Sequence, residues 1–136
     1  MDVLYEQGEG IVKAMLAKSN DPRLQSINLL TMEGNPIISS AFTRVELTLF
    51  AAMSAAVLQS TILGFTRLKP DEKPVQALVE GTHGRFFLIK RVMLGDKAVT
   101  MLLVGQGETE GFGETVQVLE QELRERLGLP DPKPKS

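Results

Sequence analysis

The feature that most restricts the fold is a long apolar stretch, "VELTLFAAMSAAVLQSTILGF", which runs from Val45 to Phe65 and carries one ionisable side chain, Glu46. The 3.6-residue period of an α-helix distributes its apolar side chains over two opposite sides. One side consists of Leu47, Phe50, Ala51, Leu58, Ile62 and Phe65, and the other of Val45, Leu49, Ala52, Met53, Ala56, Ser60 and Leu63. Because a helix in a small domain usually buries one stripe, the second side needs another partner.

The second side could be covered by a membrane, by the chain itself or by a second copy. A membrane matches the length, but Thr48, Ser54, Gln59, Ser60 and Thr61 interrupt the stretch and it lies in mid-domain. The chain itself is a second candidate, if the helix is buried entirely within the monomer. A second copy is favoured by residue size, since Phe50, Leu58 and Phe65 suit a sheet, whereas Ala52, Ala56 and Ser60 permit the close approach of another helix.

Apolar periodicity and turn residues define the other elements. We predict a helix at 3–18, strands at 24–32 and 37–40 joined by an "EGNP" turn, strands at 75–80, 85–92 and 97–104, and a helix at 114–127. The order αββαβββα indicates one α/β (α+β) domain at 1–128, with a five-stranded antiparallel sheet and helices on both faces. The strand from Ala98 to Val104 is apolar nearly throughout, so we expect it to be central. Residues 129–136 are expected to form a short disordered tail.

The strand "VQALVE" at 75–80 has no internal Lys or Pro that would block pairing at a sheet edge. Two copies could therefore join edge to edge and form one continuous sheet. The predicted dimer interface consists of Val45, Leu49, Ala52, Met53, Ala56, Ser60 and Leu63 in the helix and of Val75, Ala77 and Val79 in the strand.

Composition excludes several classes of function. The 15 basic and 17 acidic residues give a net charge of -2, and the sequence has no basic stripe beyond Lys90 and Arg91, so nucleic acid is not an expected partner. The absence of Cys excludes disulfides, thiol nucleophiles and Cys-ligated zinc. The first residues, "MDVLYEQGEG", do not resemble a signal or transit peptide. We expect a cytoplasmic protein without a membrane span.

The glycine-rich loop in "VGQGETEGFGETVQVL", residues 104–119, raises the question of phosphate binding. Its four glycines, Gly105, Gly107, Gly111 and Gly113, fit neither the P-loop nor the dinucleotide-binding spacing. Glu108, Glu110 and Glu114 would also repel an anion. We interpret the loop as a flexible connector whose acids favour the start of the next helix.

No catalytic group emerges from the remaining polar residues. His83, in "EGTHGR", is interpreted as a solvated turn residue, because no Cys or carboxylate cluster accompanies it. The serines lack a paired histidine, and the carboxylates of the last helix and its preceding loop are interpreted as a solvated face. No catalytic residue, cofactor or metal ligand is predicted, and the chain is not expected to be an enzyme.

The sequence resembles the Roadblock/LC7 domain from about Asp2 to Leu127. The resemblance rests on "TMEGNPIISS", on the small-residue helix "LFAAMSAAVLQSTILGF" and on "ALVEGTHGRFFLIKRV"; the segment "GETEGFGETV" departs from it. It implies a homodimer whose second helices lie antiparallel on one side of a shared sheet, with the first and last helices on the other. Roadblock proteins bind small Ras-like GTPases, as MglB-like regulators do, or scaffold larger assemblies, and are not themselves enzymes.

For such a protein, we expect a GTPase to dock on the outward shoulder of the paired helices, at Arg44, Thr48, Ala55 and Gln59. Arg44 is either a residue supplied to the GTPase site or an ordinary surface arginine. Two alternatives remain: a longin- or profilin-like scaffold module with nucleotide-independent partners, and a PAS-like small-molecule sensor.

Overall fold

The computed structural model describes residues 2–129. Its elements are α1 (Asp2–Ser19), β1 (Leu24–Thr31), β2 (Pro36–Ser39), α2 (Arg44–Leu68), β3 (Gln76–Glu80), β4 (Arg85–Leu94), β5 (Lys97–Gln106) and α3 (Phe112–Arg126). The predicted order αββαβββα is confirmed. Of the predicted tail at 129–136, Leu129 is half-buried and packs against the core, and residues 130–136 lie outside the described residues.

The five strands form one antiparallel sheet in the order β2-β1-β5-β4-β3. As expected from its apolar sequence, β5 lies in the centre, where Val99, Met101, Leu102 and Leu103 are all buried. The "EGNP" turn is also confirmed, since Gly34 adopts a φ of 92° between β1 and β2. The α+β fold class predicted from the sequence is therefore correct.

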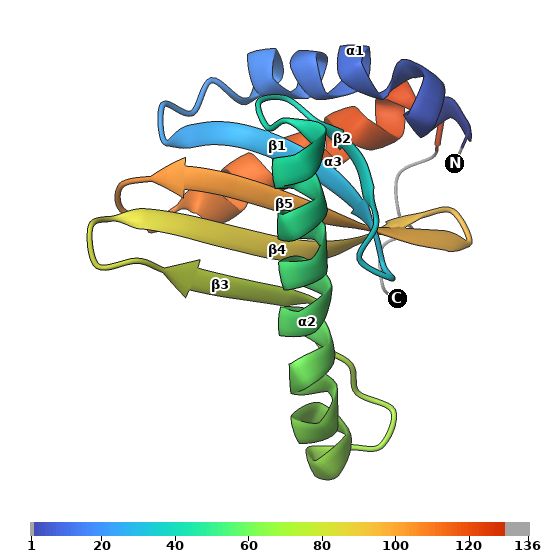
Figure 1. Cartoon of the computed structure of the whole chain (residues 1–136), viewed down its shortest axis with the longest axis vertical. Coiled ribbons are helices and arrows are strands. Elements are labelled where there is room, and N and C mark those ends of the chain that lie inside the picture. Colours follow the sequence, from blue (N-terminus) through green and yellow to red (C-terminus); the bar gives the residue numbers. More distant parts are fainter. Residues whose placement is uncertain (1, 130–136) are drawn as a thin grey trace.

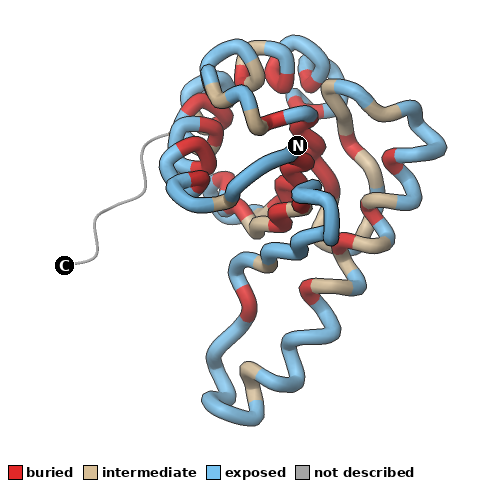
Figure 2. The backbone as a smooth tube through the Cα atoms, turned by 90° about the vertical axis from the view of Figure 1, so that its left-hand side faces the viewer, coloured by how far each residue is buried: buried red, intermediate tan, exposed pale blue. Residues whose placement is uncertain are grey.

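Helices cover both faces of the sheet (Figure 1). α1 and α3 lie side by side on one face, where they enclose the larger apolar core with Ile27, Phe86 and Met101. α2 crosses the other face and encloses a smaller core with Leu30, Ile89 and Leu102. Figure 2 shows that burial is concentrated where the helices meet the sheet, whereas the far half of α2 is largely exposed.

Two helices differ from their predicted bounds by more than one residue at one end. α2 begins at Arg44 and extends to Leu68, beyond the predicted end at Phe65. α3 begins at Phe112, two residues before the predicted start, because the ring of Phe112 packs in the core and draws the glycine-rich segment into the first helical turn. The end of α2 and the start of α3 thus each extend beyond their predicted bounds.

Candidate interaction surface

The start of α2 is fixed by its local sequence. Thr43 is the N-cap, and its hydroxyl oxygen accepts a hydrogen bond from the backbone N–H of Glu46, while a Glu46 carboxylate oxygen accepts one from the backbone N–H of Thr43. The hydrogen bond from the Thr43 backbone holds the pKa of Glu46 below its ordinary value. This capping box, a Thr-x-x-Glu signature readable in the sequence, sets where the apolar helix begins relative to the sheet.

The first half of α2 packs on the sheet through one stripe. Leu47, Ala51, Ser54 and Leu58 are buried, and Phe50 packs at the margin of this core. Ser54, which the sequence pattern placed on neither side of the helix, is buried; its hydroxyl donates to the Phe50 carbonyl at 2.8 Å, so its polar atom is satisfied within the helix. Of the six residues predicted to face the sheet, Leu47, Ala51 and Leu58 are therefore buried against it, Phe50 packs at the margin, and Phe65 is half-buried.

The opposite stripe of α2 has no cover in the described part of the chain. Val45 is 74% exposed, Leu49 is 69% exposed and Leu63 is 72% exposed. Between them, Ala52, Ala56 and Ser60 are exposed and Met53 is half-buried. The alternative of a helix enclosed within the monomer is thus incorrect, and the helix residues of the predicted dimer interface form one continuous apolar stripe.

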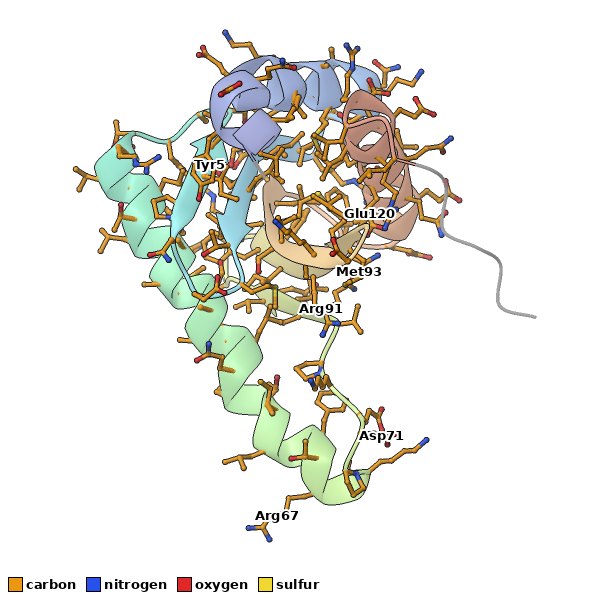
Figure 3. The ribbon with its side chains drawn as sticks, turned by 90° about the vertical axis from the view of Figure 1, so that its right-hand side faces the viewer. Tyr5, Arg67, Asp71, Arg91, Met93 and Glu120 are labelled. Carbon is orange, nitrogen blue, oxygen red and sulfur yellow. The ribbon has the colours of Figure 1, made fainter. Side chains whose placement is uncertain are left out.

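α2 is also longer than the sheet that it crosses. In Figure 1 it passes over β3, the last strand, and continues beyond it, and Figure 3 places Arg67 and Asp71 at the far tip. From Gln59 to Gly64 every residue is exposed. Leu68 is 85% exposed. Ile62, which was predicted to face the sheet, is exposed because its own sheet ends before reaching it.

The sheet edge beneath this projection is formed by β3. Val75 is 55% exposed, Leu78 and Val79 are each 44% exposed, and Ala77 is half-buried. The backbone N–H of Arg91 donates to the Val75 carbonyl and that of Gly81 donates to the Arg85 carbonyl. In an antiparallel ladder, bonded pairs alternate, so the odd-numbered residues of β3 bond to β4. The N–H and C=O groups of Gln76, Leu78 and Glu80 therefore point to the free edge.

The opposite edge of the sheet, β2, is less suited to pairing. It has four residues and begins with Pro36. α1 also packs on it closely: a Cβ atom on Gly8 would lie 3.0 Å from Cγ2 of Ile38. Of the two edges, β3 is therefore the one that remains available.

The four residues predicted to contact a GTPase lie on α2 toward the β1–β2 turn. The Ala55 side chain lies against this turn, where a Cβ atom on Gly34 would come within 2.9 Å of it, so Ala55 is half-buried. Arg44 is exposed, and its Nη1 donates to the Ile37 carbonyl at 3.4 Å. Thr48 and Gln59 are exposed. The β1–β2 turn therefore lies along one flank of α2, the flank that carries these four residues.

The glycine-rich loop, interpreted from the sequence as a flexible connector, makes contacts with Arg23 that the sequence did not indicate. Nη1 of Arg23 donates to the carbonyls of Glu108 and Glu110, each at 2.7 Å. The guanidinium also lies 5.1 Å from the centroid of the Phe112 ring. With its carbonyls turned toward an arginine and Gly107 and Gly111 at positive φ, the loop forms a defined turn.

Asp21 anchors this arginine and provides a pH-dependent contact. Its carboxylate accepts hydrogen bonds from the Arg23 side chain at 3.0 and 2.8 Å, from the Arg23 backbone N–H and from the Thr115 hydroxyl. The Arg23 side chain, against the opposing effect of burial, holds the pKa of Asp21 well below its usual range. The network joins the α1–β1 turn, the loop after β5, and α3.

We predict that Asp21 contributes to stability above about pH 4 and loses that contribution as the pH falls, because its pKa is lower in the folded than in the unfolded chain. The melting temperature of the wild-type protein should fall between about pH 5 and pH 2. Asp21→Asn should melt lower at pH 7 and show a flatter dependence over that interval. Parallel curves for the two proteins would contradict this role for Asp21.

Two carboxylates of α3 differ from the expected solvated face, whereas Glu108, Glu110, Glu114 and Glu125 are exposed as predicted. The side chains of Glu120 and Glu122 are 13% and 10% exposed, so they are not part of a solvated face. Glu120 pairs with Lys90 of β4 and with Arg124, and Glu122 pairs with Arg126. Figure 3 shows Glu120 on the side of α3 that faces the sheet. The two i,i+4 pairs within α3 could be predicted from their spacing, but the pairing of Glu120 with Lys90 of β4 could not.

The remaining polar features lie near the β3–β4 turn. His83 is exposed in the β3–β4 turn, where its carbonyl accepts from Nε2 of Gln106 at 2.7 Å. Within residues 2–129, no group of three His, Asp or Glu side chains is placed to hold a metal ion. A hollow of about 330 Å³ near this turn is lined by Glu80, Phe86, Glu108, Thr109 and three glycines.

α2 alone, among the described helices, is long and apolar enough to cross a membrane by length and composition. Core helices of soluble proteins meet the same criterion, and Leu47, Ala51 and Leu58 of α2 pack on the sheet. These contacts assign the first half of α2 to a protein core.

Comparison with known proteins gives matches in structure only. No protein-family model matches the sequence, and no curated protein matches it. A Roadblock/LC7 domain from Streptomyces avermitilis superposes with a TM-score of 0.68 at 15% identity, covering 88% of this chain and 97% of that one. MglB from Myxococcus xanthus gives 0.67 at 13%, covering 91% and 90%. A structure of MglB with tetrameric arrangement gives 0.65 at 17%, covering 90% and 86%. The chain therefore has the Roadblock/LC7 fold.

Proposed function

We propose that this protein is a homodimeric binding protein that regulates or scaffolds a small Ras-like GTPase, which docks on paired α2 helices. The observation that carries the proposal is the combination of an uncovered apolar stripe on α2 with a free β3 edge beneath the same helix. A second copy joined at β3 would continue the sheet under the projecting half of α2 and bring the two helices together. The GTPase partner comes from the resemblance to Roadblock/LC7 proteins.

The two-fold arrangement determines which surface is left for a GTPase. One flank of α2 is occupied by the β1–β2 turn at Gly34, so a second helix would lie on the other flank. Arg44, Thr48, Ala55 and Gln59 would then remain on the two outer shoulders of the helix pair, each bordered by a β1–β2 turn. A platform of this kind acts by holding the catalytic groups of its partner in the geometry that stabilises the developing charge, without supplying a residue.

The proposal is tested in two steps. Light scattering should give the mass of a dimer at about tens of micromolar. Immobilised protein should then retain small GTPases of the same organism in one nucleotide state, GDP or a GTP analogue, and not in the other. Equal retention of both states would favour the nucleotide-independent scaffold, and a monomer at these concentrations would overturn the dimer platform.

The role of Arg44 is tested by measuring GTP hydrolysis by the GTPase that the protein retains. If Arg44 is an ordinary surface residue, the Arg44→Ala variant should still stimulate this hydrolysis. If the variant binds the GTPase but no longer stimulates it, Arg44 is a residue supplied to the GTPase site. The hydrogen bond from Arg44 to the Ile37 carbonyl favours the first outcome.

Leu78→Pro is predicted to weaken the dimer while leaving the monomer folded. The Leu78 N–H points to the free edge, so proline removes a donor needed for pairing with the second copy but none needed for β4. Two such donors are lost per dimer, which should raise the dissociation constant roughly tenfold or more. Sedimentation measures this change. Ala77→Pro is the control, because it removes a bond to β4 and should lower the free energy of unfolding instead.

A further inference from the structure

A largely apolar pocket lies beside α2 on the sheet face that it crosses. It has a volume of about 180 Å³, and its walls are formed by Phe42, Phe50, Phe87 and Val104 together with the buried Ser26 of β1. The exposed residues Gln25, Ala41 and Arg85 lie at its rim. Phe42 and Phe50 are stacked at 4.5 Å between ring centroids, and Phe50 meets Phe87 edge to face at 5.7 Å. An apolar cavity of about 150 Å³ holds a benzene-sized group, so this pocket has room for one large apolar side chain.

We infer that this pocket receives the projecting end of α2 from a second copy of the chain, with Leu68 as the inserted side chain. The inference rests on the proposed dimer and specifies where each copy holds the other. It makes the aromatic pocket an interface site that is incomplete in a single chain.

The position of the pocket supports a second α2 helix as the occupant. Gly34 lies against Ala55 and closes one flank of α2. The pocket lies on the other flank, where Phe87 is paired in the sheet with Val79 of the free-edge strand. The exposed Val79 thus connects the pocket with the edge at which a second copy would join.

The length of the projection matches the distance to be covered. Gln59 to Leu68 rises about 15 Å at 1.5 Å per residue, and strands lie about 4.8 Å apart. The projecting half of α2 therefore spans about three strands of a continued sheet, which in a second copy are β3, β4 and β5. Phe87 belongs to β4 and Val104 to β5, so the pocket lies within this reach.

The chemistry of the helix end fits the pocket. Leu68 follows Phe50 by five helical turns, at about 3.6 residues per turn. The two side chains therefore lie on the same side of α2, and Leu68 continues the stripe that faces the sheet. It is 85% exposed in the single chain. Arg85 at the pocket rim would lie near the negative end of the second copy's helix dipole, which favours a cation there.

Cross-linking between single cysteines tests the inference, because the native chain has none. Lys69→Cys retains Leu68 and marks the helix end, and Ala41→Cys marks the exposed rim of the pocket. A mixture of the two variants treated with a short bismaleimide should give a cross-linked dimer in higher yield than either variant alone. Ala17→Cys, on exposed α1, replaces Ala41→Cys in the control mixture and should give none.

A second variant separates this inference from the dimer itself. Leu78→Cys alone should cross-link across the paired β3 edges. If Leu78→Cys cross-links and the mixture of Lys69→Cys with Ala41→Cys does not, the pocket assignment is wrong and the dimer stands. If neither cross-links and the protein is monomeric, both are overturned. Leu68→Asp should in addition raise the dimer dissociation constant about tenfold with an unchanged melting temperature of the monomer; an unchanged constant would count against Leu68 as the inserted side chain.

Discussion

Replacing Ala56 with arginine is expected to convert the dimer into a monomer without altering the fold. Ala56 lies in the middle of the uncovered stripe of α2 and is exposed in the single chain. Arginine is a good helix former, so the free energy of unfolding of the monomer should change by no more than about 0.5 kcal/mol. In a pair of antiparallel helices the small side chain permits close approach, which a long charged side chain prevents.

The size of the effect follows from two contributions. Each copy brings one guanidinium into an apolar contact, and the two-fold symmetry brings two like charges near each other. Juxtaposed like charges at an interface cost several kcal/mol, and every 1.4 kcal/mol is about tenfold in a dissociation constant. We expect the dimer dissociation constant to rise at least about a hundredfold, as measured by sedimentation or light scattering over a dilution series.

Ala17→Arg is the matched control for this experiment. Ala17 is exposed on α1, which covers the opposite face of the sheet, so the same substitution places the same charge far from α2. It should leave the dimer unchanged. A dimer that survives Ala56→Arg with undiminished affinity would show that the α2 stripe is not the contact between copies, whatever the effect at β3.

The architecture could be predicted from the sequence because local signals agree with it. The paucity of charge from Val45 to Phe65 marks a helix with two apolar sides, and the apolar run from Ala98 to Val104 marks the central strand. These patterns depend only on neighbours in the chain. Because the sheet covers only one of the two apolar sides of α2, the other side is exposed in the single chain.

The features that the sequence did not indicate depend on distant residues. Arg23 binds the carbonyl of Glu108 across 85 positions of the chain, and Lys90 of β4 meets Glu120 of α3. No periodicity relates such pairs, so the glycine-rich loop was interpreted as flexible and the α3 carboxylates as solvated. The projection of α2 beyond β3 could not be foreseen either, because it depends on where the sheet ends beneath the helix.

Replacing Gly105 with alanine is expected to destabilise the fold strongly, although its backbone is ordinary extended strand. Gly105 lies in β5 directly opposite Phe86 of β4, and the Phe86 ring lies over it. A Cβ atom on Gly105 would lie 2.2 Å from Cζ of Phe86 and within 2.8 Å of two further ring atoms. The ring would have to move, because no carbon atoms pack that closely.

The surroundings leave the Phe86 ring little room to move. Phe86 is 1% exposed and meets the Phe112 ring edge to face at 4.9 Å, and Phe112 in turn carries the Arg23 guanidinium. Displacing the ring therefore disturbs the start of α3 and the clamp on the glycine-rich loop. Overpacking of a well-packed core costs about 1–3 kcal/mol, occasionally more, and we expect Gly105→Ala to lie at the upper end. Urea denaturation monitored by circular dichroism measures the loss.

Two further variants decide whether the Phe86 ring is the cause. Gly10→Ala is the matched control, since no atom lies within 4 Å of a Cβ added at this exposed position of α1; it should stabilise the protein by about 0.5–1 kcal/mol. The double variant Gly105→Ala, Phe86→Leu shortens the side chain that the new methyl group meets. Because the two residues are in contact, their effects should not add, and the double variant should lose less stability than the sum of the single changes. Strict additivity would mean that the alanine methyl group is accommodated without moving Phe86, and that the close approach of ring and strand does not determine this part of the core.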